Sequence, residues 1–533
     1  MFQNHRGNKM MKSFAGLTIL LILAIPAYAE ESVTIPLAEY NAIIKRLDAM
    51  QGQLTELDSL RKRVEELERH GGLPASRQPE EHQAQVTRDI NTLYNSVDDL
   101  ETKQAKNMLN FGGELRTRVD GYRAESYTSS NMNTFQELVQ EGVEPHQARE
   151  QSTTYYESTT DNNNWTNRFR INMDAQISES LSFHGRLSMY KNWSDSDDGS
   201  SGDMLNDWNA SHWPGSSNLW VDRAYVDWTP AGLPIPIALT VGRHPSSDGP
   251  PLEFKENRLR QSTYPGLIID GEADGIVLTF GLEKLIGWKN TGLRFAYGKG
   301  YHSDDDSIIG TTFPFLDDSE TGDSDMFAGF FESEIPGIKN SMMVLSYVRA
   351  RDLPFRLGES ANNLLDIPNQ NVGDLDIWGA HFQTRDFLDS GLDFFLSYGG
   401  NRSRPNGNAP GAIFGLLSDD GLEPHSGYSL YGGLRYTLPY APLNRPKLGF
   451  EYNHGSKYWF SMTMGTAELF NKLATRGDVY DVYYIQQVDK HLFFRLGYMH
   501  ADYSHTRSGC YLTSPQPSNA SLSNYYLLMD VRF

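Results

Sequence analysis

The sequence is short of two things on which many functions depend, thiols and an excess of basic side chains. Its 533 residues include one cysteine, Cys510, which excludes an intramolecular disulfide and the paired cysteines of a covalently bound haem. Lys and Arg number 47 against 68 Asp and Glu, giving a net charge of −21. A nucleic-acid partner requires a basic face, so we expect none, and we expect no cofactor bound by the chain itself.

Long apolar runs are also absent beyond residue 29. A transmembrane helix needs about 20 consecutive apolar residues, and the one apolar stretch, Phe14–Ile25, is shorter than that. Basic residues precede this stretch, and Ala27, Tyr28 and Ala29 follow it. This order is typical of a secretory signal peptide, which we place at residues 1–29, with an uncleaved N-terminal anchor as the alternative.

Heptad spacing marks the next part of the chain. Apolar residues recur every three or four positions from Tyr40 to Leu67 and again from Val86 to Leu100, with charged residues between them. The pattern predicts an α-helical coiled-coil segment over residues 30–107. It is either a periplasmic stalk, which would favour a homotrimer, or a helix pair folded back on itself or on the main domain.

From residue 108 onward the apolar period changes to two. In RFRINMDAQI, Phe169, Ile171 and Met173 share one face, and Arg168 and Arg170 share the other. Such alternation means that one face meets apolar surroundings and the other polar surroundings. We count about sixteen segments of this kind, near the length of about 9–11 residues that a tilted membrane strand requires.

The connections between these segments alternate between short and long. Seven short turns interleave with eight long loops that carry most of the Asp, Asn, Ser and Gly. A propeller or β-helix would instead repeat at a fixed period, which the sequence lacks. We therefore predict an all-β fold over residues 108–533, a transmembrane, up-and-down antiparallel β-barrel of about 16 strands, preceded by the coiled-coil segment.

The last ten residues, NYYLLMDVRF, alternate up to a terminal Phe533. A closed barrel has no edge strand, so its wall can include a chain end. With the signal peptide and the interleaved loops, this pattern resembles Gram-negative outer-membrane proteins. The resemblance implies a bacterial outer-membrane location, contact with lipid bilayer and lipopolysaccharide, and insertion by the barrel-assembly machinery. Aromatic residues near strand ends, such as Trp228 and Trp459, suit the two interface belts.

The chain also resembles porins. Its strand number is similar to that of the trimeric porins, and its helical segment is similar to the stalks of phosphate-selective porins. More closely, it resembles a porin-like family of anaerobic proteobacteria known as a domain of unknown function. The resemblance implies a water-filled channel for passive diffusion of small hydrophilic solutes or ions. The alternative is a barrel scaffold that sheathes a multihaem cytochrome partner, which would supply every haem.

The inward-facing positions are rich in charge, which would be costly without water or partners. Water in an open lumen removes that cost, so the pattern favours a pore. The predicted pore-lining residues are Arg116, Arg118, Arg168, Arg170, Asp174 and Arg186. The arginines either attract anions to one section of the wall or pair with nearby acids such as Glu114 and Asp120 without a role in selectivity.

The third long loop, residues 243–275, is similar in place and length to the loop that folds inward in general porins. Its acidic residues are candidates for a constriction opposite the arginines: Asp248, Glu253, Glu256, Asp270 and Glu272. A plain surface loop is the alternative.

No distinctive catalytic or metal-binding pattern stands out. EYNHGS, residues 451–456, holds Asn, His and Ser, but adjacent strand residues point to opposite faces, so we expect no enzymatic activity. The acidic runs 194–203, 302–307 and 316–325 lack the spacing of calcium-binding EF-hands. They are typical of solvated loops, which divalent ions can bridge to lipopolysaccharide.

Overall fold

A computed structural model describes most of the chain from Leu109 to Phe533. The described residues are 109–130, 134, 137–138, 141–143, 145–193, 219–271, 273–301, 324–355, 370–408, 415–418, 420–463, 468–505 and 514–533. The predicted signal peptide (1–29), the predicted coiled coil (30–107), Glu272 and almost all of the acidic runs lie outside them.

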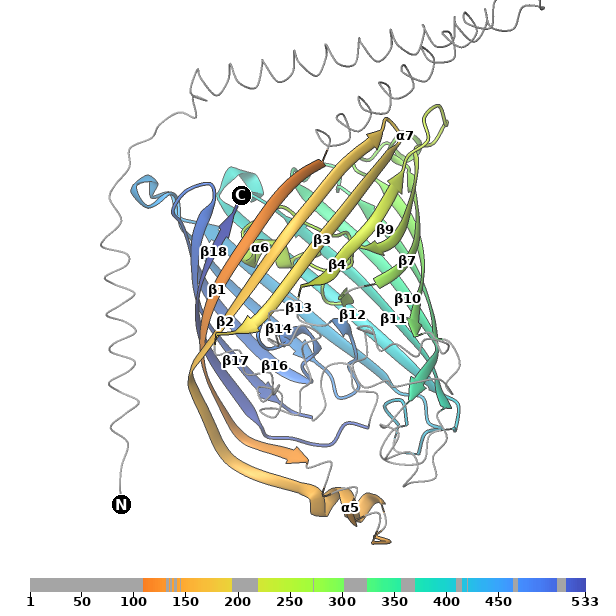
Figure 1. Cartoon of the computed structure of the whole chain (residues 1–533), viewed down its shortest axis with the longest axis vertical. Helices are drawn as coiled ribbons and strands as arrows, with labels where there is room; N and C mark the ends of the chain where they lie inside the picture. Colours follow the sequence, from red (N-terminus) through yellow and green to blue (C-terminus); the bar gives the residue numbers. More distant parts are fainter. Residues whose placement is uncertain are drawn as a thin grey trace, which may run out of the picture. The chain divides into compact units, whose positions relative to one another are not determined.

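Sixteen strands form a closed antiparallel barrel, as predicted from the alternating segments (Figure 1). Each barrel strand pairs with the next barrel strand along the chain, and β18 pairs with β1 to close the ring. The barrel strands are β1 (Leu109–Ser130), β2 (Thr153–Ser178), β3 (Leu181–Asn192), β4 (Trp220–Trp228), β5 (Ile237–His244), β7 (Ala273–Gly281), β8 (Gly292–Tyr301), β9 (Ser324–Ser333), β10 (Ser341–Phe355), β11 (Gln370–Thr384), β12 (Leu392–Pro405), β13 (Ser426–Thr437), β14 (Lys447–Gly455), β16 (Gly477–Gln487), β17 (Leu492–Tyr503) and β18 (Ser521–Arg532).

The remaining elements are short. They are the helices α5 (Pro145–Ser152), α6 (Leu252–Lys255) and α7 (Glu283–Ile286), the 3₁₀ turns η2 (Phe387–Asp389), η4 (Ala441–Leu443) and η5 (Lys472–Ala474), and the strands β6 (Ile269–Asp270) and β15 (Met462–Thr463). Among the helices of the described residues, none is long and apolar enough to cross a membrane.

The barrel is closed by the last strand of the chain. β18 pairs with β1 from Glu114↔Arg532 to Glu125↔Ser521. The backbone of Phe533 continues this ladder, because Gly113 N donates to Phe533 O at 2.7 Å and Phe533 N donates to Gly113 O at 3.0 Å. The terminal residue is therefore held in the wall by ordinary strand pairing.

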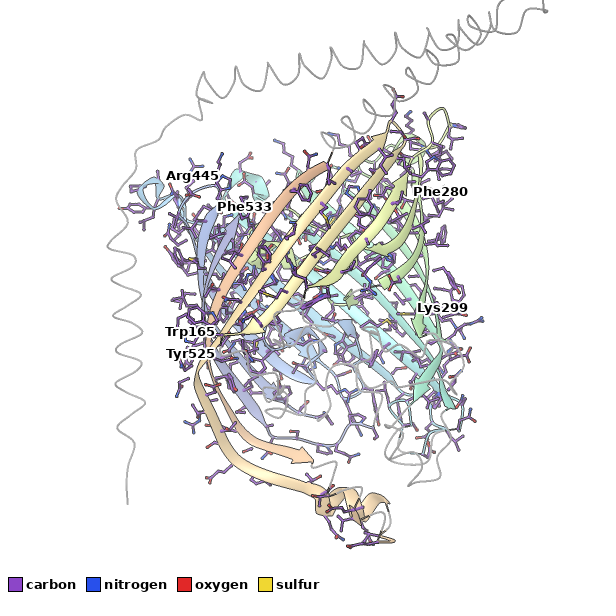
Figure 2. The ribbon with its side chains drawn as sticks, in the orientation of Figure 1. Trp165, Phe280, Lys299, Arg445, Tyr525 and Phe533 are labelled. Atoms are coloured by element: carbon purple, nitrogen blue, oxygen red, sulfur yellow. The ribbon has the colours of Figure 1, made fainter. Side chains whose placement is uncertain are left out.

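The wall has an apolar outer face and an inner face that carries charged as well as apolar side chains. On β18 the outward side chains are apolar, and Tyr525 and Phe533 are strongly exposed, whereas Asp530 on the inner face is fully buried. Figure 2 shows Phe280 and Phe533 near one end of the strands, and Trp165 and Tyr525 close together farther along the strands. The alternation that follows from the strand period thus separates two environments.

β1 and β2 are longer than the sequence pattern predicts. One of the predicted long loops runs from Tyr122 to Trp165, but β1 continues into it to Ser130 and β2 begins at Thr153, with a register shift between Asp120 and Tyr122. Figure 1 shows this hairpin extending past the neighbouring strands toward α5. The extension carries polar side chains on both faces, so it lacks the alternation by which a barrel strand is recognised.

A hydrophobic core fills part of the barrel interior. Residues 245–271, here called the inner segment, fold into the lumen. Residues 456–476, the companion segment, join them through the parallel pairing of β15 with β6. Leu267, Ile268, Trp459 and Phe460 from the two segments are almost completely buried. They share one cluster with inward-facing residues of β9 to β13, namely Phe330, Val344, Val348, Ile377 and Phe395.

The predicted interface position of Trp459 is therefore wrong. Its indole is buried in this core, and its Nε1 donates to Leu473 O at 2.9 Å. Tryptophan suits both a membrane interface and a buried site with one acceptor, so its sequence position alone could not distinguish them.

Two inward-facing glycines leave space for the large side chains of the inner core. A Cβ at Gly399 would lie 2.5 Å from the Trp459 ring, and one at Gly379 would lie 2.7 Å from Ile268 Cδ1. Any larger residue at either position would push a segment away from the wall.

We expect Gly399→Val to lower the free energy of unfolding by about 1–3 kcal/mol, the usual cost of overpacking. Gly432→Val on the next strand is the matched control, because a Cβ there meets no atom closer than 3.5 Å. Urea titrations in detergent, followed by tryptophan fluorescence, measure both variants. Equal losses would contradict the packing of Trp459 against Gly399.

Candidate functional site: a charged wall and the inner segment

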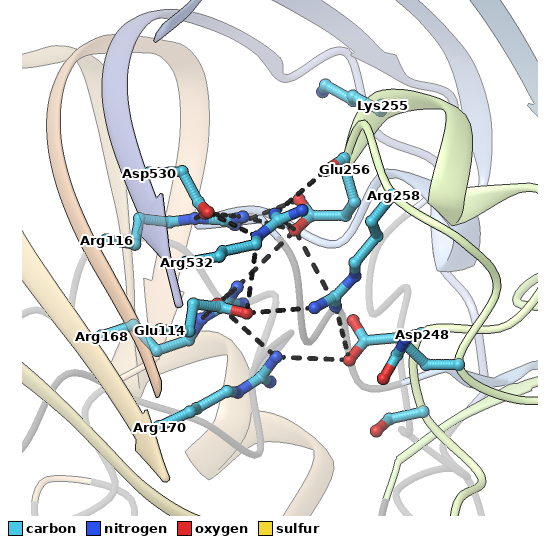
Figure 3. Close-up of polar contacts among 12 residues, drawn as sticks. Glu114, Arg116, Arg168, Arg170, Asp248, Lys255, Glu256, Arg258, Asp530 and Arg532 are labelled. Carbon is cyan, nitrogen blue, oxygen red and sulfur yellow. Dashed lines mark hydrogen bonds and ion pairs between the residues drawn. The ribbon is translucent and has the colours of Figure 1, made fainter. Parts of the chain in front are cut away.

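Opposite the hydrophobic core, the inner segment lies against a wall of arginines (Figure 3). Strand register creates this wall, because Arg116 on β1 is paired with Arg168 on β2 and with Asp530 on β18. Like charges on facing strand positions are destabilising unless anions compensate them. The anions come partly from the wall and partly from the inner segment.

Glu256 of the inner segment binds three strands of the wall at once. Its carboxylate accepts from Arg116 Nη1 at 3.0 Å and from Arg495 Nη1 at 3.2 Å. Its backbone oxygen accepts from Arg532 Nη2 at 3.0 Å. Because these partners lie on β1, β17 and β18, a single carboxylate spans the seam where the barrel closes.

Asp248 has the same role on the neighbouring strands. Its Oδ2 lies 3.3 Å from Nη1 of both Arg170 and Arg186, and 2.9 Å from Arg258 Nη2. Its backbone N–H donates to Asp270 at 2.8 Å, which ties the two ends of the inner segment together. Asp248 therefore connects β2, β3 and the inner segment through one oxygen.

Glu114 on β1 completes the contact from the side of the wall. It accepts from Arg168 Nε at 3.0 Å and from Arg258 Nη1 at 3.0 Å. Arg258 thus joins an acid of the wall to an acid of its own segment, as Figure 3 shows. The inner segment contributes both signs of charge to the network.

The companion segment extends the network through Glu468. This carboxylate lies 2.7 Å from Lys255 Nζ and accepts from Arg118 Nη1 at 2.7 Å. Arg118 also donates to Asp120 from Nε at 2.8 Å. The two lumenal segments are therefore linked to each other as well as to the wall.

The structure brings together the five predicted arginines and separates the predicted acids. Asp248 and Glu256 contact the arginines. Glu253 instead accepts from Gln383 at 2.7 Å and Arg385 at 3.2 Å. Asp270 supports Asp248, and Glu272 lies outside the described residues. Asp174 is 58% exposed and contacts His184 at 2.6 Å.

The arginine side chains of the wall are buried, whereas the sequence pattern suggested an open, water-filled lumen. The five predicted arginines are each at most 5% exposed, and Glu256 is 1% exposed. Ion pairs, in place of open water, compensate their charge. A charged inward face has the same pattern in sequence whether it meets water or a partner, so the spacing could not decide between the two.

Burial and the arginines act on the carboxylates in opposite directions. Burial disfavours the ionised forms of Glu256 and Asp248, but the surrounding arginines outweigh it and hold both pKa values well below their ordinary range. A carboxylate with a lowered pKa stabilises the fold at neutral pH, and its contribution declines as the pH falls from the ordinary pKa to the lowered one.

Sequence reasoning missed three members of the network, Lys255, Arg258 and Glu468. A signal for the first two was present, because KENRLR (255–260) alternates charge within an otherwise apolar loop. Glu468 lies in a stretch without alternating apolar residues, so its position in the network could be known only from the fold.

Other candidate chemistry is weak in the described part of the chain. No group of three or more His, Cys, Asp or Glu residues there is arranged to hold a metal ion. In EYNHGS, His454 contacts Asp478 at 2.9 Å, while Asn453 accepts from Ser429 at 2.9 Å on the buried inner face. The two side chains thus engage separate partners.

Comparison with known proteins identifies one family. A family model described as "Protein of unknown function (DUF3373)" matches residues 158–529, more than half of the chain. No curated protein matches. The chain is similar to the high-pH structure of Pseudomonas putida OprB, with 11% identity, a TM-score of 0.44, and coverage of 81% of this chain and 96% of that one. It is also similar to Salmonella typhi OmpF in complex with daunomycin, with 11% identity, a TM-score of 0.41, and coverage of 80% and 97%.

We expect Glu256→Gln to lower the free energy of unfolding by about 3–5 kcal/mol, because it removes the charge that buried arginines share. Asp274→Asn is the control. Asp274 also forms an ion pair, with its Oδ2 2.7 Å from Arg243 Nη2, but its side chain is 58% exposed. Its expected cost is at most about 1 kcal/mol. Chemical unfolding at pH 7 measures both.

The Glu256 effect has a defined pH dependence. Because its folded pKa lies below the ordinary value of 4.5, the difference from wild type should persist above that pH and shrink below it. Equal losses for the two variants at pH 7 would contradict the role given to Glu256.

Proposed function

We propose that this chain, which belongs to the DUF3373 family of proteins of unknown function, is a bacterial outer-membrane channel for passive diffusion of small hydrophilic solutes or ions. One observation carries the proposal. A closed sixteen-strand barrel has an apolar outer face, and charged side chains line its inner face on β1 to β3. The proposed protein is a non-enzymatic transport protein.

The outer face supports a membrane location. Apolar side chains on the outer face are more than two fifths exposed, among them Leu345, Leu396, Leu434 and Val482. Water would disfavour so much apolar surface, whereas lipid would accept it. Lipid in turn requires that every backbone group be paired, and a closed barrel provides that pairing. A periplasmic stalk formed by residues 30–107 remains part of the proposal.

The inner face supports transport of polar solutes along a narrow path. An eight-strand barrel is already wide enough for side chains to fill, and about sixteen strands leave space for an aqueous channel. Here the inner and companion segments occupy much of that space. We therefore propose a restricted channel in which charged and polar side chains, more than width, select what passes.

The cytochrome-sheath alternative is less well supported by the geometry. A partner threaded through the barrel would need the space that the inner segment occupies between β1 and β13. The ion pairs of Glu256 and Asp248 would have to break for it to enter. The passage of small solutes makes no such demand.

We expect the purified protein to give small, stepwise conductance in planar bilayers, because the inner segment narrows the lumen. Protein unfolded by heat before reconstitution is the control. The reversal potential under a salt gradient reports charge selectivity. A folded barrel, verified by its heat-dependent gel migration, that inserts without any steps would contradict the channel function.

We expect Met529→Arg to destabilise the barrel in lipid by about 2–4 kcal/mol, because Met529 lies midway between Tyr525 and Phe533 on the outer face of β18. Val531→Arg is the matched control on the same face. It lies closer to the end of the strand, where a charge costs about 0–1 kcal/mol. Unfolding in lipid vesicles measures both, and equal costs would contradict a membrane-embedded outer face.

A further inference from the structure

Polar cavities run along one side of the inner segment. A cavity of about 430 Å³ begins at Asn110 and Gly112, near the end of the barrel where the chain terminates. A second cavity of about 270 Å³ adjoins it, and both are lined by Tyr225, Arg260 and Gln261. The shared lining residues place these two cavities next to each other.

A third, much smaller cavity continues the series. Its volume is about 50 Å³, and it shares His244 and Tyr264 with the second cavity. Its other lining residues include Lys299 on β8 and Met326 on β9, which lie toward the opposite end of the barrel from Asn110. The three cavities therefore lie one after another along the wall from β1 to β9.

The chemistry of the two sides of the inner segment differs. The first two cavities are lined by ionisable side chains of both signs, including Asp174, Arg223, Asp227 and Arg294. The opposite side of the inner segment packs into the hydrophobic core of β9 to β13. A hydrated ion keeps its polar contacts only on the cavity side.

The second and third cavities meet at His244 and Tyr264, which line both of them. Their rings meet edge to face with centroids 5.7 Å apart, and both side chains are buried. Tyr264 also contacts Phe330 at a centroid distance of 4.5 Å, so its ring is wedged between β5 and β9. Beyond this pair the cavity is small and mostly apolar in lining.

We propose that solutes cross along the β2–β9 wall, through these cavities, and that Tyr264 with His244 sets the narrowest point of the path. The inference rests on the proposed channel function and specifies where in the barrel the channel runs. The favoured cargo is a small ion or hydrophilic solute that can exchange water for the mixed charges of Asp227, Arg260 and Arg294. Tyr264 and His244 act as size-selecting residues.

A thiol-blocking experiment tests the location. Thr279 lines the second cavity, and Gln487 faces the lumen on the other side of the inner segment, where its side chain contacts Asn257. Each is changed to cysteine in a Cys510→Ser background, and single channels are treated with a bulky cationic methanethiosulfonate. We expect block of at least half the current for Thr279→Cys and little change for Gln487→Cys, with labelling verified by mass spectrometry.

A second pair of variants tests the narrowest point. Tyr264→Ala should raise single-channel conductance at least twofold, and Tyr264→Phe, which keeps the ring, should leave it near wild type. Block at Gln487→Cys without block at Thr279→Cys, or unchanged conductance in Tyr264→Ala, would overturn the path while leaving the channel intact. Failure of the wild-type protein to conduct would overturn the channel function itself.

Discussion

The ion pairs between the inner segment and the arginine wall determine what the interior of this barrel can be. Glu256 and Asp248 each form ion pairs with arginines from several strands, and Arg258 of the inner segment donates to Glu114 of the wall. Removing these charges from water is costly, and only close, multiple pairing offsets that cost. The wall and the inner segment therefore compensate each other's buried charge, and neither is stable in this arrangement without the other.

The hydrophobic core fixes the other side of the same segment. Leu267 and Ile268 pack against β9 to β13, while Glu256, eleven positions before Leu267, faces the seam of the barrel. A segment held by charge on one side and by apolar contact on the other has little freedom to move across the lumen. Passage is then left to the cavities beside it, so the interactions that stabilise the fold also define the proposed route.

The sequence predicted those features that depend on local periodicity. Strand alternation is a property of neighbouring residues, so the sixteen strands and the outward set of β18 followed from it. The continuation of β1 and β2 past Tyr122 was missed because its polar side chains show no apolar face.

Features that depend on distant partners could not be predicted. The pairing of Arg116 with Glu256 joins residues 140 positions apart, and Trp459 finds its core only when the companion segment folds inward. For these residues the same pattern suits water, lipid or a buried partner. The fold decides among them because it brings the partners together.

Excision of residues 250–265, the part of the inner segment that carries Glu256 and Arg258, tests the central claim most directly. Gly266 N already donates to Pro250 O at 2.8 Å, so joining Gly249 to Gly266 removes the excursion with little change in backbone path. The measurement is single-channel conductance of this variant beside wild type. If the segment fills the lumen, conductance rises severalfold as the arginine wall becomes hydrated, whereas an unchanged conductance would show that the segment does not restrict the channel.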